Sequence, residues 1–260
     1  FQNQGIDHAG RVEIIDIGIP PAYVDAIGSR IRLVTATFVR TALPPRRLSS
    51  HKGTFGHAGI IAGSVGKTGA AAMSAQAALR MGAGLVTVAI PASVNDVLEA
   101  KLLEVMTIPM PETKARTLSR AALDRLKDFI NARTAVAIGP GLSTHPETVK
   151  LVQALVRQLD RPSVLDADAL NALAGRAALF TECTIPPILT PHPGEMARLA
   201  TESSAQSVNG DRIGTATRFA RARGCYVVLK GARTVIAGPD GLVAICPTGN
   251  PGMATAGTGD

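Results

Sequence analysis

Residues 58–81 read AGIIAGSVGKTGAAAMSAQAALRM, and this stretch decides the fold class. Residues 58–62 are small or apolar and predict a buried strand, residues 63–69 contain three glycines and predict a loop, and residues 70–81 predict a helix. A buried strand that runs through a glycine loop into a helix is the building unit of an α/β protein with a parallel sheet.

The same alternation of strand and helix continues toward the C-terminus. We expect strands at 85–90, 134–138, 163–165, 188–189 and 226–230, helices at 119–130, 144–159 and 211–223, a helix start at Pro193, and a hairpin of 235–237 with 243–246. This order indicates a mostly parallel sheet covered by helices on both faces. Ligands of such sheets bind beyond the carboxyl ends of the strands.

The first 50 residues have a different pattern. Residues 12–17 (VEIIDI) form a short apolar run that predicts a strand, closed by a glycine and two prolines nearby. Residues 21–50 read as a connector that ends in a basic stretch around Arg46 and Arg47, so we expect a domain junction there.

Composition bounds the class of protein. The chain has 260 residues, 46% of them hydrophobic and 18% charged, which suits one large or two small folded domains and excludes a disordered chain. The net charge of +7 raises the question of nucleic acid, but the arginines are scattered and aromatic residues make up only 3%. That is too few for a base-stacking platform, so we expect no nucleic-acid partner and treat the arginines as ordinary surface charge.

Cysteine usage and hydropathy bear on the compartment. The three cysteines lie far apart and match no metal-binding or disulfide spacing, which favours a reducing cytoplasm. No apolar run is long enough for a membrane span, so we expect no membrane partner. The sequence starts at Phe1 without a signal-peptide pattern, and we expect an internal piece of a longer protein.

The last four residues, Gly257-Thr258-Gly259-Asp260, carry the most chemistry. Glycines allow backbone N–H groups to gather around an anion, and an aspartate beside them can take a proton from an attacking hydroxyl. The alternative is a glycine-rich turn without a ligand.

Residues 62–69 (AGSVGKTG) look like a phosphate loop, but the spacing is wrong for one class of enzyme. A Walker-type loop needs a glycine where Ile61 stands, so that class is excluded. The loop opens a helix after a strand, which leaves either an anion contact or a structural turn.

Two further loops carry charged side chains. Asp166 and Asp168 follow a predicted strand and suit either Mg²⁺ bound through water or, for Asp168, a cap on the next helix. Lys230 follows another strand and suits either a phosphate contact or a solvated surface position.

The turn at residues 190–195 (TPHPGE) combines a rigid start with a possible ligand contact. Pro193 suits the first turn of a helix, and Glu195 suits the positive end of that helix. His192 has no comparable structural reason in the sequence, and we therefore interpret it as a substrate contact.

Together these segments resemble one family, the ADP- or ATP-dependent NAD(P)H-hydrate dehydratases of the ribokinase-like superfamily, from about residue 48 onward. The motifs that carry the resemblance are, in order, His51-Lys52-Gly53, Gly69-Ala70, Gly139-Pro140-Gly141-Leu142, Asp166-Ala167-Asp168-Ala169-Leu170-Asn171, Thr190-Pro191-His192-Pro193-Gly194-Glu195, Leu229-Lys230-Gly231-Ala232, Gly249-Asn250-Pro251-Gly252-Met253-Ala254 and Gly257-Thr258-Gly259-Asp260.

The resemblance implies a three-layer αβα fold with a mostly parallel central sheet and a lyase that repairs nicotinamide cofactors. The substrate would be the S epimer of hydrated NADH or NADPH. ADP or ATP would phosphorylate the ring hydroxyl, and loss of phosphate would restore NAD(P)H. Alternatives are a ribokinase-like kinase for a vitamin-precursor alcohol and a non-catalytic module that binds adenine nucleotides.

The resemblance also assigns residues to the substrate and to catalysis. Ala70, Gly141 and His192 would contact the hydrated nicotinamide nucleotide. Asp260 would contact it as well and act as the base on its hydroxyl. Gly257, Thr258 and Gly259 would supply the anion hole.

Nucleotide and metal contacts follow from the same resemblance. The adenine nucleotide would be held by Lys230, Gly231, Ala232, Arg233, Thr234 and Gly259. Asp166 and Glu195 would contact Mg²⁺ through water.

The resemblance also implies how the chain is divided into domains. Residues 1–30, mainly GRVEIIDIGIP at 10–20, resemble the tail of an NAD(P)H-hydrate epimerase domain fused upstream. Residues 31–50 would then be a linker, and residues 51–260 the dehydratase domain, which in the family continues past Asp260. We expect a homo-oligomer.

Overall fold

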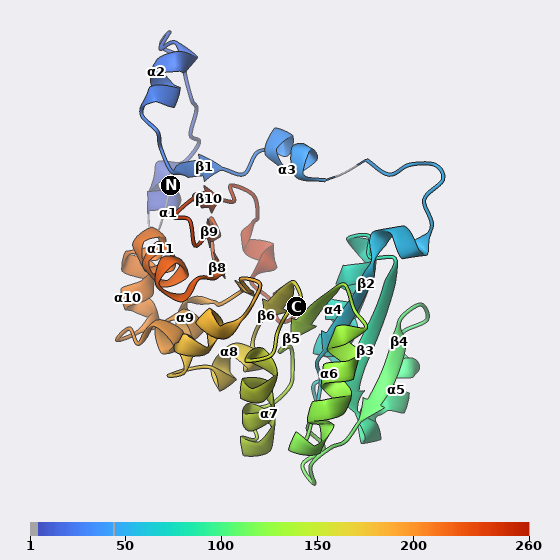
Figure 1. Cartoon of the computed structure of the whole chain (residues 1–260). Coiled ribbons are helices and arrows are strands. Elements are labelled where there is room, and N and C mark those ends of the chain that lie inside the picture. The colour runs from blue at the N-terminus through green and yellow to red at the C-terminus, as the bar shows by residue number, and fades with distance from the viewer. Residues whose placement is uncertain (1–4, 44, 260) are drawn as a thin grey trace.

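The computed structural model describes residues 5–43 and 45–259, whose strands form one sheet of ten in the order β1-β10-β9-β8-β7-β6-β5-β2-β3-β4 (Figure 1). The strands are β1 Ile31–Leu33, β2 His57–Ile61, β3 Leu85–Pro91, β4 Met106–Met110, β5 Ala135–Ile138, β6 Ser163–Leu165, β7 Ile188–Leu189, β8 Tyr226–Leu229, β9 Val235–Ala237 and β10 Val243–Ile245.

Most neighbouring strands in this sheet are parallel. The exception is β9, which runs antiparallel to β8 and to β10, and so forms the hairpin expected from the sequence. The prediction of a mostly parallel sheet is confirmed. The sequence reading did not include β4, which pairs in parallel with β3 at one edge.

Helices connect these strands. The α-helices are α1 Gly5–Ala9, α2 Pro21–Ala26, α3 Ala36–Ala42, α4 Thr68–Arg80, α5 Asn95–Glu99, α6 Leu123–Asn131, α7 Pro146–Val156, α8 Asp168–Ala172, α9 Pro193–Ala200, α10 Ala205–Gly210 and α11 Arg212–Arg223, and the 3₁₀ helices are η1 Lys52–Phe55, η2 Ala92–Val94, η3 Arg120–Ala122, η4 Ala177–Glu182 and η5 Pro251–Met253.

The strands in the middle of the sheet are buried on both faces. On β2, Ile60 packs in one cluster with the α4 residues Ala71 and Ala75, whereas Ile61 packs in a second cluster with Phe129 of α6. Successive side chains of a strand point to opposite faces, so the two clusters lie on opposite sides of the sheet. The molecule therefore has helices on both faces, as predicted.

Helix α4 owes its close approach to the sheet to its alanines. Alanine has the highest helix propensity, and its small side chain lets the helix backbone lie near β2 and β3. Ala71 and Ala75 are fully buried in this contact. The predicted apolar face of the helix at 119–130 is confirmed as well, because Leu126, Phe129 and Ile130 are all buried.

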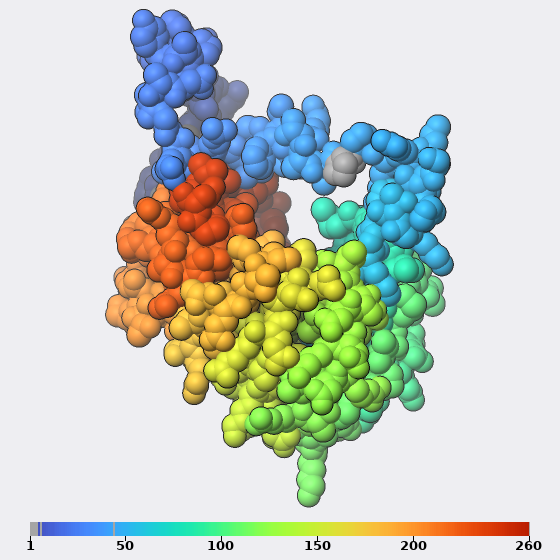
Figure 2. Space-filling model, viewed as in Figure 1, coloured from blue at the N-terminus to red at the C-terminus, as the bar shows by residue number. Residues whose placement is uncertain are grey.

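One prediction about the first 50 residues is wrong. Residues 12–17 form no strand, and Ile14, Ile15 and Ile17 are 86%, 77% and 78% exposed. An apolar run becomes a strand only where a neighbouring strand accepts its hydrogen bonds, and none lies beside it in the described chain. Figure 2 shows this N-terminal part (blue) projecting from the body of the molecule.

The expected linker, in contrast, contributes to the sheet. Residues 31–33 form β1, which pairs in parallel with β10, and the Val34 N–H continues the pairing by donating to the Ile245 carbonyl at 2.9 Å. Residues 36–42 form α3, whose N-cap Thr35 accepts a hydrogen bond from Phe38 N. The connector is thus partly regular structure that is attached to the second half of the sheet.

Candidate functional site

Five loops that carry the sequence motifs lie at one edge of the sheet. They follow β2, β5, β6, β7 and β8, which are consecutive in the sheet and mutually parallel. Parallel strands end at the same edge, and four intervals of about 4.8 Å place the outer loops about 19 Å apart. The topology therefore gathers motifs that are up to 170 residues apart in sequence into one row.

The loop after β2 meets the loop after β5. Gly141 has φ +68, and a Cβ at this position would lie 2.9 Å from the Lys67 carbonyl oxygen and 3.3 Å from Ala70 Cβ. The buried Ser64 hydroxyl donates to the Gly141 carbonyl at 2.7 Å. Ala70 and Gly141, which the sequence assigned to the same ligand, are therefore in close proximity.

The loops after β6 and β8 are joined by an ion pair. Lys230 Nζ lies 2.9 Å from Asp166 Oδ1, and the two side chains are 29% and 9% exposed. Lys230 is therefore partly buried and paired with a carboxylate, unlike an ordinary solvated surface lysine. The Asp166 backbone also packs closely against Gly139, where a Cβ would overlap the Asp166 carbonyl oxygen.

Ala167, between the two aspartates, has an unusual backbone conformation. Its φ of +49° and ψ of −117° lie outside the regions that an alanine prefers, at a cost of about 1–3 kcal/mol. Such strain is retained where the surrounding structure holds it, and it is concentrated at functional sites. Here it lies at the end of β6, between two carboxylates.

Asp168 does not cap the helix that follows it, which corrects one of our two interpretations. The N-cap of α8 is Ala167, without a side-chain cap. Asp168 Oδ2 instead accepts hydrogen bonds from Ser143 N at 2.8 Å and from Lys67 Nζ at 3.0 Å. The carboxylate thereby ties the ends of β5 and β6 to the loop that opens α4.

His192 has a structural role that the sequence reading denied it. It is the N-cap of α9, and its Nδ1 accepts hydrogen bonds from Gly194 N at 3.0 Å and Glu195 N at 3.3 Å. Glu195 completes a capping box by accepting from His192 N at 2.8 Å. The expected positions of Pro193 and Glu195 in the first turn are confirmed, and His192 stays 52% exposed at its side chain.

The C-terminal glycines cross over this row. A Cβ on Gly257, which has φ +84, would lie 2.8 Å from Met73 Cε of α4, and one on Gly259 would lie 3.4 Å from Lys230 Nζ. The segment that contains Gly257, Thr258 and Gly259 therefore lies between α4 and the end of β8. Asp260, the predicted base, is outside the described residues.

Arg212 is the functional candidate that sequence reasoning missed. We expected ordinary surface arginines, yet Arg212 is 5% exposed, and its guanidinium donates to carbonyl oxygens of the loop that follows β8. Burial lowers the pKa of this guanidinium. A signal existed, because Arg212 is the first residue of α11, where the helix dipole disfavours a cation.

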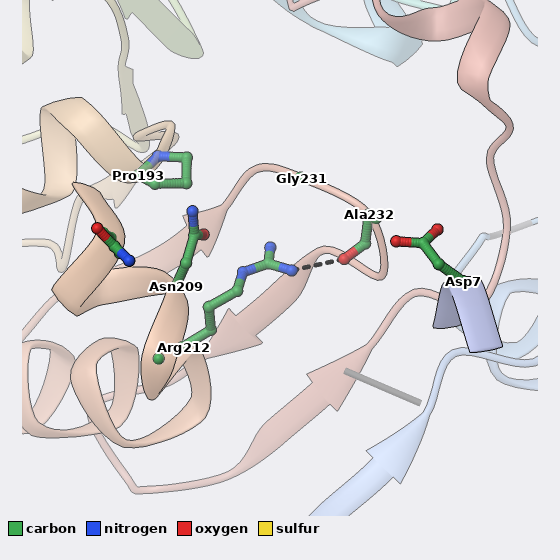
Figure 3. Close-up of a pocket in the computed structure, with 8 residues that line it drawn as sticks. Asp7, Pro193, Asn209, Arg212, Gly231 and Ala232 are labelled. Atoms are coloured by element: carbon green, nitrogen blue, oxygen red, sulfur yellow. Dashed lines mark hydrogen bonds between the residues drawn. The ribbon is translucent and has the colours of Figure 1, made fainter. Parts of the chain in front are cut away.

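A pocket of about 680 Å³ lies beside this loop (Figure 3). Its walls come from the N-terminal helix α1, the start of α9, helix α10, the start of α11 and the loop after β8, and its lining residues are Asp7, Pro193, Gln206, Asn209, Gly210, Arg212, Gly231 and Ala232. Two of the predicted nucleotide contacts, Gly231 and Ala232, line this pocket.

The described residues contain no group of three or more His, Cys, Asp or Glu side chains arranged to hold a metal ion directly. The carboxylates of Asp166 and Glu195 are already engaged by Lys230 and by the capping box. Asp166 Oδ2 accepts no hydrogen bond from the described chain, so this oxygen suits a metal-bound water. Mg²⁺ commonly keeps its waters and takes phosphate oxygens, which fits such a site.

Across the described chain, no helix combines the length and the apolar character that crossing a membrane requires.

Comparisons with known proteins agree with this arrangement. The family model for NAD(P)H-hydrate dehydratase matches residues 58–260. The bifunctional NAD(P)H-hydrate repair enzyme Nnr of Moorella thermoacetica is 50% identical over 256 residues, which are 98% of this chain and 48% of that protein. The chain thus spans about half the length of the curated relatives it matches.

Solved structures give the same result for the fold. The ADP/ATP-dependent NAD(P)H-hydrate dehydratase from Bacillus subtilis, co-crystallized with ATP and Mg²⁺, is 33% identical with a TM-score of 0.75, over 88% of this chain and 76% of that one. A ribokinase-like superfamily protein from Enterococcus faecalis is 26% identical with a TM-score of 0.74, over the same shares of the two chains. The expected three-layer ribokinase-like fold is confirmed, and the chain belongs to the NAD(P)H-hydrate dehydratase family.

Proposed function

We propose that this chain carries the nucleotide-dependent dehydratase activity of a nicotinamide-cofactor repair protein. The substrate is the S epimer of hydrated NADH or NADPH, and the co-substrate is ADP or ATP. The observation that carries the proposal is the row of five parallel strand ends, with Gly257 and Gly259 crossing it between α4 and Lys230. A row about 19 Å long has room for two nucleotides side by side.

The substrate side of the site consists of Ala70, Gly141 and His192. Gly141 lies against Lys67 and Ala70 with no space for a side chain, so the glycine lets the two loops that would contact the substrate pack together. His192 accepts two backbone hydrogen bonds through Nδ1, which leaves Nε2 for a ligand or for Glu195, whose Oε1 is 3.5 Å away. We propose that Nε2 contacts the hydrated nicotinamide nucleotide.

Asp260 acts as the base in the proposed reaction. It takes the proton of the ring hydroxyl while the hydroxyl oxygen bonds to the terminal phosphorus of the nucleotide, and the bond from that phosphorus to its bridging oxygen breaks. The backbone N–H groups of Gly257, Thr258 and Gly259 stabilise the charge on the transferred group. Phosphate is a good leaving group, so the carbon–oxygen bond then breaks, a ring proton is lost, and the double bond of NAD(P)H is restored.

The adenine nucleotide binds at the loop after β8, through Lys230, Gly231, Ala232, Arg233, Thr234 and Gly259. The ion pair of Lys230 with Asp166 supports this proposal, because it holds the lysine near Gly259 before any phosphate is present. Mg²⁺ screens the phosphate charge when bound. We propose that Asp166, and less directly Glu195, contact it through water.

One assay tests the proposal. Hydrated NADH or NADPH is incubated with Mg²⁺ and either ADP or ATP, and the absorbance of the reduced nicotinamide and the release of phosphate are followed together. Recovery of absorbance with one phosphate released per turnover supports the dehydratase. A stable phosphate ester made from a vitamin-precursor alcohol would instead identify a kinase, and ADP binding without turnover of either substrate would identify a non-catalytic module.

The organisation of the longer protein is part of the proposal. We propose that residues 1–30 are the tail of an upstream epimerase domain, that residues 31–50 are a linker that adds β1 to the sheet, and that residues 51–260 belong to the dehydratase domain. The match to only 48% of a bifunctional relative supports a second activity in the same protein. A homo-oligomer in the cytoplasm is tested by light scattering of the full-length protein and by cell fractionation.

A further inference from the structure

The guanidinium of Arg212 binds the backbone at the end of β8 and in the loop that follows it. Its Nη1 donates to the Ala232 carbonyl at 2.5 Å, and its Nη2 donates to the carbonyls of Leu229 at 2.9 Å and Lys230 at 3.2 Å (Figure 3 shows the first of these). Gly231 lies close to the same guanidinium, since a Cβ there would be 3.0 Å from Nη2. One side chain thus binds the last carbonyl of β8 and two carbonyls of the loop that is proposed to bind the nucleotide.

These carbonyl contacts orient the opposite side of the loop. A trans peptide is planar and carries its N–H on the side opposite its carbonyl oxygen. With the Lys230 carbonyl turned toward Arg212, the N–H of Gly231 points away from the guanidinium, and it donates to no other group of the described chain. Backbone N–H groups presented in this way form an anion-binding concavity.

The charge of Arg212 is not neutralised by a carboxylate. Among the described residues Arg212 forms no ion pair, and its buried Nε has no hydrogen-bond partner. Lys230 differs from it, because Asp166 already balances its charge. A buried charge balanced only by carbonyl dipoles is costly, and an anion bound nearby lowers that cost.

Helix stability does not explain the arginine either. Arg212 is the first residue of α11, where backbone N–H groups make the local potential positive and a cation is unfavourable. The cap of the helix is supplied by Asp211, which accepts from Gly214 N at 2.9 Å. The position of Arg212 is therefore explained by the loop and the pocket.

We propose that Arg212 is the positioning residue of the nucleotide loop: it turns the carbonyls of Leu229, Lys230 and Ala232 toward itself so that the Gly231 N–H meets a phosphate, and it supplies buried positive charge behind the loop. This inference rests on the proposed function. Asp7 is the carboxylate in the pocket lining, and it lies on the far side of Ala232 from Arg212 in Figure 3. The Gly231 N–H faces away from Arg212, so the phosphates bind on that face of the loop, with the guanidinium charge behind it.

The test replaces Arg212 in the full-length protein and separates phosphate binding from pocket integrity. Arg212→Lys keeps the charge but loses the fork that reaches several carbonyls. We expect ADP affinity, measured by calorimetry, to fall tenfold or more, about 1.4 kcal/mol. Adenosine, which has no phosphate, and hydrated NADH should keep their affinities within about twofold.

A matched control lies on the same helix. Arg218 is largely exposed and pairs with Asp211 at 2.9 Å, so Arg218→Lys should leave ADP affinity unchanged. If Arg212→Lys does not fold, Gly231→Ala disturbs the same loop from its other side, because its φ of +140 and its contact with Arg212 exclude a Cβ. The Gly231→Ala variant should show the same loss of affinity for ADP and no loss of affinity for adenosine.

The outcomes distinguish this inference from the proposed function. Wild-type protein that neither binds ADP nor restores reduced nicotinamide would overturn both. Wild-type protein that does both, with a folded Arg212→Lys variant that binds ADP equally well, would overturn the role of Arg212 alone. An equal loss of ADP and adenosine would show that Arg212 only supports the pocket wall, and would overturn it as well.

Discussion

Lys230 Nζ lies 2.9 Å from Asp166 Oδ1, which joins the end of β8 to the end of β6 across β7. The lysine approaches this carboxylate from the loop that is proposed to bind the nucleotide, and its ammonium lies close to Gly259. The same cation is thus balanced by a carboxylate in this structure and is the one proposed to meet a phosphate.

We expect Lys230→Ala to weaken ADP binding by about 10- to 100-fold, because a charge-assisted hydrogen bond contributes about 1.5–3 kcal/mol and each factor of ten in affinity corresponds to about 1.4 kcal/mol. Calorimetry with ADP measures this. Lys127→Ala is the control, since Lys127 pairs with Asp124 on the surface helix α6 and should leave ADP affinity unchanged. Equal ADP affinity in wild type and Lys230→Ala would remove Lys230 from the nucleotide site.

Asp260→Asn should abolish turnover while ADP affinity stays nearly intact. An amide keeps the size of the side chain but does not take a proton, and loss of a general base typically slows a reaction about 10²- to 10⁴-fold. Turnover of hydrated NADH and ADP affinity are measured on the same preparation. A variant that retains more than half of the wild-type rate would rule out Asp260 as the base.

Two substitutions separate the capping role of His192 from its proposed contact with the substrate. Asparagine is a good N-cap, so His192→Asn should keep the stability of α9. It should still lower the affinity for hydrated NAD(P)H far more than the affinity for ADP. His192→Ala should show the same loss of substrate affinity and, in addition, lower the free energy of unfolding by about 1 kcal/mol. Urea denaturation and calorimetry give the two quantities.

If His192→Asn binds hydrated NADH like the wild type, the histidine serves only as the cap.

Gly141 and Gly175 form a natural comparison. Their φ values are +68 and +70, but a Cβ would crowd Lys67 and Ala70 at Gly141 and would meet nothing within 4 Å at Gly175. Gly175→Ala should therefore cost only the penalty of the left-handed backbone, about 1–2 kcal/mol. Gly141→Ala should lower the free energy of unfolding by a further 1 kcal/mol or more, about the usual effect of overpacking. It should also lower the affinity for hydrated NADH.

Equal losses of stability by denaturation, with unchanged substrate affinity, would contradict a close contact at Gly141.

The lowered pKa of Asp211 predicts that the stability of the fold depends on pH. Hydrogen bonds from Arg218 and from Gly214 N lower the pKa of this carboxyl below its ordinary 3.8. A depressed pKa in the folded state contributes stability that is present above pH 3.8 and is lost as the pH falls through the folded-state value. Asp211→Ala should lower the free energy of unfolding by about 1 kcal/mol at pH 7, mainly through loss of the helix cap.

Thermal unfolding from pH 3 to pH 7 tests this sign. The difference between wild type and Asp211→Ala should shrink toward the acid end, and a difference that grows there would contradict the assignment.

Predictions from the sequence were most reliable where the local pattern of residues agrees with the fold. Residues 163–165 and 188–189 were predicted as strands with the observed bounds, because each is a short apolar run closed by polar or rigid residues. The prediction failed at residues 12–17, which also contain an apolar run but pair with no strand among the residues that the structure describes. The pattern of a strand is local, whereas its hydrogen-bond partner is not.

The site shows the same division. Pro193 and Glu195 could be assigned from sequence because helix capping depends on residues within one turn. The cap formed by His192 was missed, since an imidazole nitrogen is an unusual acceptor at that position. Arg212 was missed for a different reason: its carbonyl partners are 17 to 20 residues away and depend on how α11 packs against β8.

The sequence by itself determined the class of sheet, the family and the residues that carry the proposed chemistry, because hydrophobic periodicity, glycine loops and charged residues at strand ends are properties of short segments. Only the tertiary structure decided which charges are balanced and which are not. Strand order puts Asp166 two strands from Lys230 and so neutralises the lysine, while the packing of α11 buries Arg212 against carbonyl groups and leaves it without a counter-charge in the described chain. Electrostatic balance depends on distances between segments remote in sequence, and those distances exist only after the chain has folded.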